Sequence, residues 1–223
     1  MQETPEWAAI ADTRRGFYRM FGRALLAPEE GLTVMLQAAA DYLEARDLTR
    51  FAFYPYWLSF RGALAEGPAI DDLATTYVRL FGSGVDGALC PPIESWYKTE
   101  ARFGGTAQLV AALEADYRGL GLAVVGNAEP PDHASTQLEA MSALCAREAE
   151  AWRGSRDPDA ADALGCQDRF LRSHLATWFG DFADRVRSAD PDGWYHAVTE
   201  ATDAFVVQEV DLVRAMRRQM GAA

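Results

Sequence analysis

The stretch PPDHASTQLEAMSALCAREAEAW, residues 130–152, decides the fold of this chain. Four apolar side chains recur in it at spacings of three, four and seven residues: Leu138, Met141, Cys145 and Trp152. This period places them on one face of an α-helix. The two prolines disfavour helix before it, and Asp132 is well placed to cap its first turn. The stretch therefore predicts a rigid entry followed by a long amphipathic helix.

The same helical period extends over most of the chain on both sides of this stretch. The further apolar stripes are Trp7, Ile10, Phe17, Phe21 and Leu25; Leu32, Met35, Ala39 and Leu43; Leu73, Tyr77, Leu80 and Phe81; Leu109, Leu113, Tyr117 and Leu120; Leu171, Leu175, Trp178 and Phe182; and Trp194, Val198, Ala201, Phe205 and Leu212. No stretch of five or more residues alternates convincingly with the period of a strand. We therefore predict an all-α fold, a single helical-bundle domain over residues 1–223, with possible lobes 1–128 and 129–223 joined near Pro130-Pro131.

Capping, polar and proline residues predict several helix boundaries. Asp71 or Asp72 is expected to cap the helix that follows it, and Arg153–Ala163 is interpreted as a polar break between helices. The loop from about Gly82 to Glu100 is long, aromatic and proline-bearing. Because long ordered loops tend to be functional, this loop and the junction Pro130–His133 are the two candidate sites.

Charge and composition exclude several classes of protein. The 223 residues are 49% hydrophobic and carry a formal net charge of −12, with a pI of about 4.7. A field of that sign repels nucleic-acid phosphates and anionic lipid surfaces and favours basic partners. The chain has no uncharged apolar run of the roughly 18 residues that span a bilayer, and its acidic start lacks the apolar region of a secretory signal. Three separated cysteines, Cys90, Cys145 and Cys166, indicate reduced thiols, so we expect a cytoplasmic protein with no nucleic-acid partner and no stable membrane insertion.

The sequence lacks motifs for metal, nucleotide or catalytic chemistry. His133, His174 and His196 show no metal-ligand pairing, no two cysteines form CxxC, and neither a P-loop nor GxGxxG is present. We therefore predict no metal, no cofactor and no enzymatic activity. His174, four residues from both Phe170 and Trp178, is interpreted as a buried, hydrogen-bonded histidine.

The segment TRRGFYR, residues 13–19, resembles a twin-arginine export signal. Such a signal needs an uncharged apolar segment next, whereas charged residues and Pro28 follow here. Phe17 and Phe21 also fit the first helical stripe. We therefore interpret the segment as the surface of the first helix.

Four elements occur in an order and spacing typical of one protein family. They are YVRLF at Tyr77–Phe81, PPIESWY at Pro91–Tyr97, PDH at Pro131–His133 followed by LEAMSAL at Leu138–Leu144, and a helix with Phe170, His174, Leu175 and Trp178. Together they resemble the TorD/DmsD/NarJ family of redox-enzyme maturation chaperones, and the resemblance covers roughly residues 10–215.

The resemblance implies a TorD-like helical bundle and a cytoplasmic chaperone. Such a chaperone binds the twin-arginine leader, or the apo form, of a molybdenum-cofactor oxidoreductase and holds it for cofactor insertion and assembly or export. The partner is then a molybdoenzyme precursor, and the chain a monomer or a homodimer. A basic, partly apolar leader needs carboxylates beside an apolar groove, which an acidic helical protein can supply. Two alternatives are a GTP-binding or weakly hydrolytic helical protein and a stable structural subunit of a redox complex.

The resemblance also implies which residues bind the client. Asp132 and His133 match the family's Asp-His pair, so Asp132 would accept hydrogen bonds from leader arginines and His133 would line the groove. The alternative is that Asp132 only caps the next helix. Pro131 belongs to the same set, and Glu139 is expected to add to an acidic rim.

The remaining site residues are expected to be structural or to line the groove: Tyr77, Phe81, Glu94, Ser95, Tyr97, His174 and Trp178. Glu94 is expected to satisfy backbone donors or to pair with Arg79 of the preceding helix.

Overall fold

The computed structural model describes residues 4–46, 48–82, 87–98, 105–123 and 129–221. Within these ranges the chain is helical and forms no β-strand, which confirms the predicted all-α class. The elements are α1 (Thr4–Ala24), α2 (Leu32–Glu44), α3 (Tyr54–Ala65), α4 (Ile70–Phe81), α5 (Glu94–Tyr97), α6 (Thr106–Gly119), α7 (Ala134–Arg153), α8 (Asp157–Ser173), the 3-10 turn η2 (Leu175–Thr177), α9 (Phe179–Ala189) and α10 (Trp194–Gln219).

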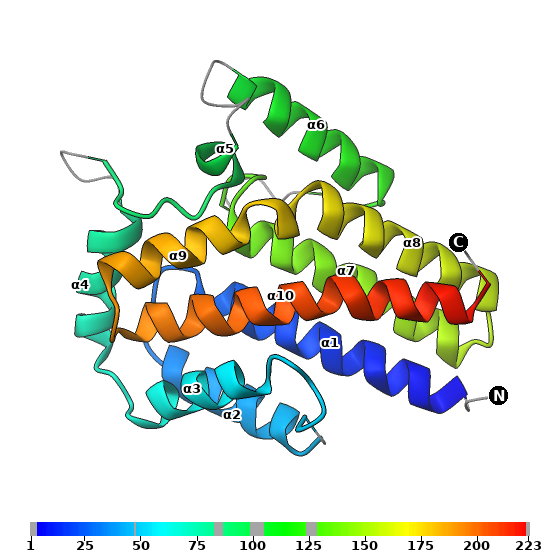
Figure 1. Cartoon of the computed structure of the whole chain (residues 1–223), viewed down its shortest axis with the longest axis horizontal. Coiled ribbons are helices and arrows are strands. Elements are labelled where there is room, and N and C mark those ends of the chain that lie inside the picture. Colours follow the sequence, from blue (N-terminus) through cyan, green and yellow to red (C-terminus); the bar gives the residue numbers. More distant parts are fainter. Residues whose placement is uncertain (1–3, 47, 83–86, 99–104, 124–128, 222–223) are drawn as a thin grey trace.

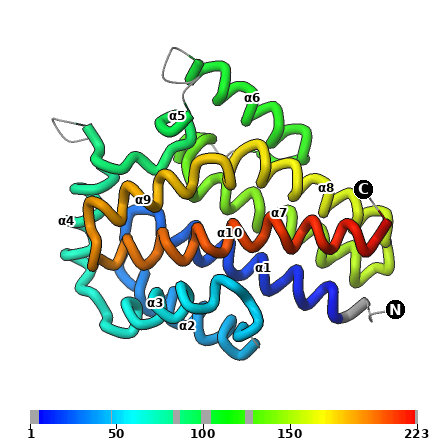
Figure 2. The backbone as a smooth tube through the Cα atoms, in the orientation of Figure 1, coloured from blue at the N-terminus to red at the C-terminus, as the bar shows by residue number. Residues whose placement is uncertain are grey.

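Four long helices, α1, α7, α8 and α10, form the centre of the molecule (Figure 1). α1 packs along much of the length of α7, α7 packs on α8, and α8 packs on α10. α2 and α3 cover one side of this bundle, and α6 lies on the opposite side beside α5 (Figure 1). The tube in Figure 2 shows that the start of α1 and the end of α10 lie at the same end of the bundle. Among the described helices, none combines the length and apolar character needed to cross a membrane.

An aromatic cluster joins α1, α3 and α10. The ring of Phe205 in α10 lies 4.9 Å from that of Tyr18 and 5.2 Å from that of Phe17, measured between centroids. Phe17 also meets Phe53 and Trp57 edge-on, at 5.1 and 5.2 Å. Each such pair contributes about 0.5–1.5 kcal/mol beyond its burial, so the apolar stripe predicted for the first helix forms one side of the core.

Arg14 contradicts the interpretation of the 13–19 segment as helix surface. Its guanidinium is buried, with only 4% of the side chain exposed. Nε donates to Glu209 at 2.9 Å, Nη1 to Glu148 at 2.7 Å and Nη2 to the amide oxygen of Gln167 at 2.5 Å. One arginine therefore ties α1 to α10, α7 and α8. Because its partners are distant in sequence, the local pattern did not reveal them.

The prediction of one continuous helix from Leu171 to Phe182 is wrong, because the chain leaves the helical conformation at His174. α8 ends at Ser173, and His174 has φ −128° and ψ −95°, outside the helical region. Neither glycine nor proline occurs at this point. The break turns the imidazole toward α5 and α6, so a tertiary contact overrides the helical pattern.

Three smaller predictions are also wrong. In α2, Leu32 and Leu43 are buried as predicted, but Met35 is 45% exposed, and the buried residues between them are Leu36 and Ala40 in place of Met35 and Ala39. α4 begins after Ala69 without a side-chain cap, and Asp71 and Asp72 lie in its first turn. The expected polar break 153–163 is shorter, because α8 already begins at Asp157 with Pro158 in its first turn.

Helices from both predicted lobes meet in the bundle, since α1 packs along α7. The division into lobes 1–128 and 129–223 stays a prediction. Part of the expected loop from Gly82 to Glu100, residues 83–86 and 99–100, lies outside the described residues.

Replacing Arg14 with leucine is expected to lower the free energy of unfolding by about 3–5 kcal/mol, because two carboxylates would remain buried without their cation. Urea unfolding monitored by circular dichroism measures this change. Arg19→Leu, on the exposed side of the same helix, is the matched control and should stay within about 0.5 kcal/mol of the parent. A loss below about 1 kcal/mol for R14L would show that this contact does not hold the helices together.

Candidate functional site

The buried carboxylate of Glu94, at the start of α5, is the centre of a polar hub. It accepts hydrogen bonds from Gln137 Nε2 in α7 at 2.5 Å and from His174 Nδ1 at 3.2 Å. Lys98 Nζ lies 2.5 Å from its other oxygen. The amide oxygen of Gln137 in turn accepts from Trp178 Nε1 at 3.1 Å. The hub therefore fixes α5 against α7 and the α8–α9 break.

His174 is hydrogen-bonded and 6% exposed, as the sequence predicted. Its Nε2 lies 2.9 Å from a carboxylate oxygen of Asp116 in α6, and its Nδ1 faces Glu94. Two acceptors on opposite sides favour the doubly protonated ring. Burial alone would lower the pKa of His174, but the hydrogen bonds to Glu94 and Asp116 outweigh it and raise this pKa above its usual value.

Burial and hydrogen bonding also oppose each other at the Glu94 carboxylate, with the signs of their effects on the pKa reversed. Burial alone would raise the pKa of Glu94, but hydrogen bonds from His174 and Lys98 outweigh it and hold this pKa below its usual value. The expected pairing of Glu94 with Arg79 is wrong, because Arg79 pairs with Asp190 at 2.7 Å.

Main-chain bonds join the hub to the Pro130–His133 junction. The amide of Glu94 donates to the carbonyl of Asp132 at 2.9 Å, and the amide of Ser95 donates to the Asp132 carboxylate at 3.2 Å. Tyr117 of α6 donates its hydroxyl to the carbonyl of Pro131 at 2.7 Å. The residues of the two predicted loops are thus held side by side, although they lie some 37 positions apart.

His133, and not Asp132, caps α7. Its Nδ1 accepts from the amide of Ser135 at 3.2 Å, and no described bond joins the Asp132 carboxylate to the first turn of α7. Asp132 and His133 are each 3% exposed. Burial lowers the pKa of His133 to about 4, so the ring is neutral near pH 7. The structure therefore gives both side chains internal bonds, and their contact with a client stays a prediction.

The predicted aromatic residues pack around α9. Tyr97 stacks on Trp178 with centroids 5.5 Å apart. Phe81 lies 5.9 Å from Phe182, and Tyr77 meets Phe81 edge-on at 5.2 Å. These side chains therefore join α4 and α5 to the bundle.

A groove of about 890 Å³ opens beside the junction, between α1, α2 and the first turns of α7. Met35, Ala39 and Tyr42 give it apolar surface, and the buried side chains of Met20 and Leu36 lie behind them. Glu139 is exposed on α7 and lines the groove, whereas Asp132 and His133 do not. The predicted role of Glu139 in an acidic rim that binds the client stays a prediction. The volume is of the order that binds ligands or several side chains.

The two sides of the groove carry opposite charges. Arg15 and Arg19 project from α1, and neither has an ion pair with any described residue. Glu129 and Glu139 line the side nearest the junction and likewise form no ion pair within the described ranges. An occupant with basic groups would therefore be attracted to the junction side and repelled from α1.

Sequence reasoning missed Gln137, Lys98 and Asp116, although they complete the hub. Gln137 is a fully buried polar residue on a helix, and neither its type nor its spacing distinguishes it from a solvated one. Among the described residues no cluster of His, Cys, Asp and Glu is arranged to hold a metal ion.

The chain is similar to known proteins of one family. Residues 31–184 match the family model described as nitrate reductase delta subunit. A segment of 86 residues is 34% identical to chaperone protein TorD of Aeromonas salmonicida and covers 37% of each chain. A segment of 83 residues is 32% identical to chaperone protein TorD of Vibrio cholerae serotype O1, covering 36% of each chain. The matches thus span little more than a third of these curated relatives.

A solved structure shares the fold. The crystal structure of a protein assigned to redox enzyme maturation in Archaeoglobus fulgidus matches with a TM-score of 0.52 over 93% of both chains, at 21% sequence identity. At that identity the similarity establishes the architecture alone.

The two buried histidines are expected to give conformational stability opposite slopes on either side of pH 6.5. The pKa of His133 falls from 6.5 to about 4 on folding. Between these two pH values the unfolded chain binds more protons than the folded chain, so the free energy of unfolding rises with pH, by up to roughly 3 kcal/mol. Because the pKa of His174 is raised, the folded chain binds more protons above pH 6.5 and stability falls as pH passes through the folded value.

Urea unfolding across the pH range measures both slopes. His133→Asn, which keeps a capping acceptor, should flatten the slope between about pH 4 and pH 6.5, and His174→Gln should flatten the slope above pH 6.5. Unchanged slopes in both variants would contradict the assigned protonation states.

Proposed function

The chain belongs to the nitrate reductase delta subunit family, and on this basis we propose that it is a chaperone for a molybdenum-cofactor oxidoreductase. It binds the twin-arginine leader, or the apo form, of that enzyme in the cytoplasm and holds it for cofactor insertion and assembly or export. The observation that carries the proposal is the groove between α1, α2 and α7, which combines apolar surface with unpaired carboxylates.

The groove suits a leader in size and chemistry. A leader presents arginines followed by an apolar helix, and such a helix is recognised by apolar anchors seated in a groove. Met20 and Met35 line the groove, and methionine adapts to varied apolar partners. Apolar burial at about 25 cal/mol per Å² supplies the favourable free energy.

Charge sets the direction in which the leader lies. The leader's arginines approach Glu129 and Glu139 at the junction side, because a carboxylate accepts the guanidinium through charge-assisted hydrogen bonds. Arg15 and Arg19 repel the same arginines from α1. The apolar part of the leader then extends along α2, past Met35 and Tyr42.

The hub supports this groove without touching the client. Bonds from Glu94 and Ser95 hold the junction at the groove's edge, and Pro131 restricts its backbone. Asp132 and His133 act mainly through the position of the junction and the cap of α7. Removing either side chain then weakens binding by displacing Glu129 and Glu139.

The proposal assigns no catalytic step to the chain and leaves it a monomer or a homodimer. A stable structural subunit would instead remain with the mature enzyme after cofactor loading. A GTP-binding protein would show nucleotide binding by calorimetry. Neither of these two outcomes is expected of a chaperone, whose purified chain would bind the isolated leader peptide.

Glu139→Lys is expected to weaken the binding of a twin-arginine leader peptide at least tenfold, which corresponds to about 1.4 kcal/mol. The substitution replaces an attractive charge by a repulsive one at the groove. Isothermal titration calorimetry at 150 mM salt measures the change, using the leader of the molybdoenzyme that the chain captures from its native cytoplasm.

Asp211→Lys is the matched control. Asp211 is 80% exposed at its side chain on α10, outside the groove, and the substitution makes the same change of net charge. Its affinity should remain within about twofold of the parent, because exposed charges more than a Debye length apart are largely screened. Equal affinity of E139K and the parent would exclude the groove as the leader site.

A further inference from the structure

Helix α6 is held to the bundle along one narrow face. Leu113, Tyr117 and Leu120 are buried, and most of the remaining side chains of the helix are exposed. The ring of Tyr117 lies 5.7 Å from that of Phe170 in α8, measured between centroids. An element with few buried contacts can open without unfolding the rest of the molecule. The polar bonds that fix α6 therefore decide how firmly it is held.

One of these bonds depends on a proton. The Asp116 carboxylate of α6 lies 2.9 Å from Nε2 of His174, so this nitrogen must carry a hydrogen for a bond to form. On the other side of the ring, Nδ1 lies 3.2 Å from the Glu94 carboxylate and needs a hydrogen for the same reason. A neutral imidazole carries only one ring hydrogen. Both bonds therefore exist together only while His174 is protonated.

The two partners of His174 belong to segments that hold the same junction. The amide of Glu94 donates to the carbonyl of Asp132 at 2.9 Å. From α6, Tyr117 donates its hydroxyl to the carbonyl of Pro131 at 2.7 Å. Protonated His174 thus joins the two supports of the junction, one on α5 and one on α6.

Charge and burial decide which bond is lost with the proton. Among the described residues, the charged groups that face His174 are Glu94 and Lys98 on the α5 side and Asp116 on α6. Glu94 is fully buried and has further donors in Lys98 and Gln137. The side chain of Asp116 is 54% exposed. Water can therefore solvate the carboxylate of Asp116 but not that of Glu94, so the remaining hydrogen stays on Nδ1 and the bond to α6 breaks.

We propose that Asp116 and His174 form a proton-controlled latch for the groove: α6 is closed against the junction while His174 is protonated, and it loosens when the ring releases a proton to solvent. This inference rests on the proposed leader site and names a means of its regulation. Neither Asp116 nor His174 lines the groove, so both are positioning residues.

The latch acts on the acidic side of the groove. A loosened α6 no longer holds the carbonyl of Pro131, and Glu129, which precedes it and lines the groove, loses its position. Because hydrogen bonds raise the pKa of His174, the closed form binds the proton more tightly and the transition lies above pH 6.5. The leader therefore binds more tightly below the transition than above it.

Amide hydrogen exchange on the full chain without a ligand tests the latch itself. From about pH 6 to about pH 9, the protection factors of α6, each taken relative to the intrinsic exchange rate at the same pH, should fall by about fivefold more than those of α1 and α7. Asp116→Ala should show the low protection at both pH values. Asp211→Ala, at an exposed position of α10, is the matched control and should behave as the parent does. Protection of α6 that stays constant over this range in the parent would overturn the latch.

Calorimetry over the same pH range tests the coupling to the groove. The probe is the leader of the captured molybdoenzyme, acetylated at its N-terminus and with any histidine replaced by glutamine, so that its charges stay constant. The affinity of the parent should fall about threefold or more as the pH rises, and that of D116A should be low and independent of pH. A constant affinity in the parent, or an undiminished slope in D116A, would overturn the coupling. Absence of leader binding at every pH would instead contradict the proposed function, and the exchange measurement would still decide the latch.

Discussion

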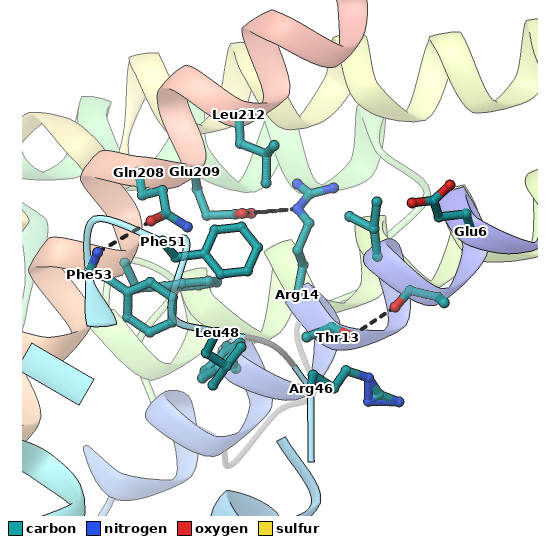
Figure 3. Close-up of a pocket in the computed structure, with 14 residues that line it drawn as sticks. Glu6, Thr13, Arg14, Arg46, Leu48, Phe51, Phe53, Gln208, Glu209 and Leu212 are labelled. Atoms are coloured by element: carbon teal, nitrogen blue, oxygen red, sulfur yellow. Dashed lines mark hydrogen bonds and ion pairs between the residues drawn. The ribbon is translucent and has the colours of Figure 1, made fainter. Parts of the chain in front are cut away.

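The guanidinium of Arg14 is the contact on which the rest of the molecule depends. It joins α1 to α7, α8 and α10 through three hydrogen-bonded partners in a buried setting. A buried ion pair contributes little net stability compared with well-packed apolar residues, but breaking one is costly. In this arrangement of the helices both buried carboxylates, Glu148 and Glu209, pair with Arg14 (Figure 3 shows the pair with Glu209). We infer that the network contributes mainly to the specificity of the helix arrangement. The groove uses α1 as one of its sides, so its shape follows from how this helix is held.

Two opposite faces of α1 then serve different purposes. Its inward face carries Arg14 and the aromatic stripe, and its outward face carries Arg15 and Arg19 along the groove. On the far side of the groove, the Glu94 hub holds the junction before α7. Glu94 does so because its single carboxylate meets donors from three separate segments, Lys98, Gln137 and His174. A groove between two such supports is formed in advance, which under the proposed function lowers the entropic cost of binding the leader.

Sequence reasoning reached the all-α class and the first and seventh helices because those depend on local apolar spacing. It also identified Glu94, Asp132, His174 and Trp178, which the structure brings into one connected region. It failed where a distant partner decides the outcome. The break at His174 follows from its bonds to Glu94 and Asp116, and the burial of Arg14 follows from carboxylates 134 and 195 positions away. His133 replaced Asp132 as the cap because the Asp132 carboxylate accepts from Ser95 across the junction.

The central claim, that the leader lies in the groove between α1, α2 and α7, is tested most directly by photo-crosslinking. A leader peptide carrying benzoylphenylalanine in its apolar segment is bound to the full chain, irradiated, and its attachment sites are mapped by mass spectrometry. The account predicts attachment to Met35 or Tyr42 of α2, which line the groove and are exposed. Attachment confined to α4, or to Phe51 and Leu212 outside the groove, would contradict it.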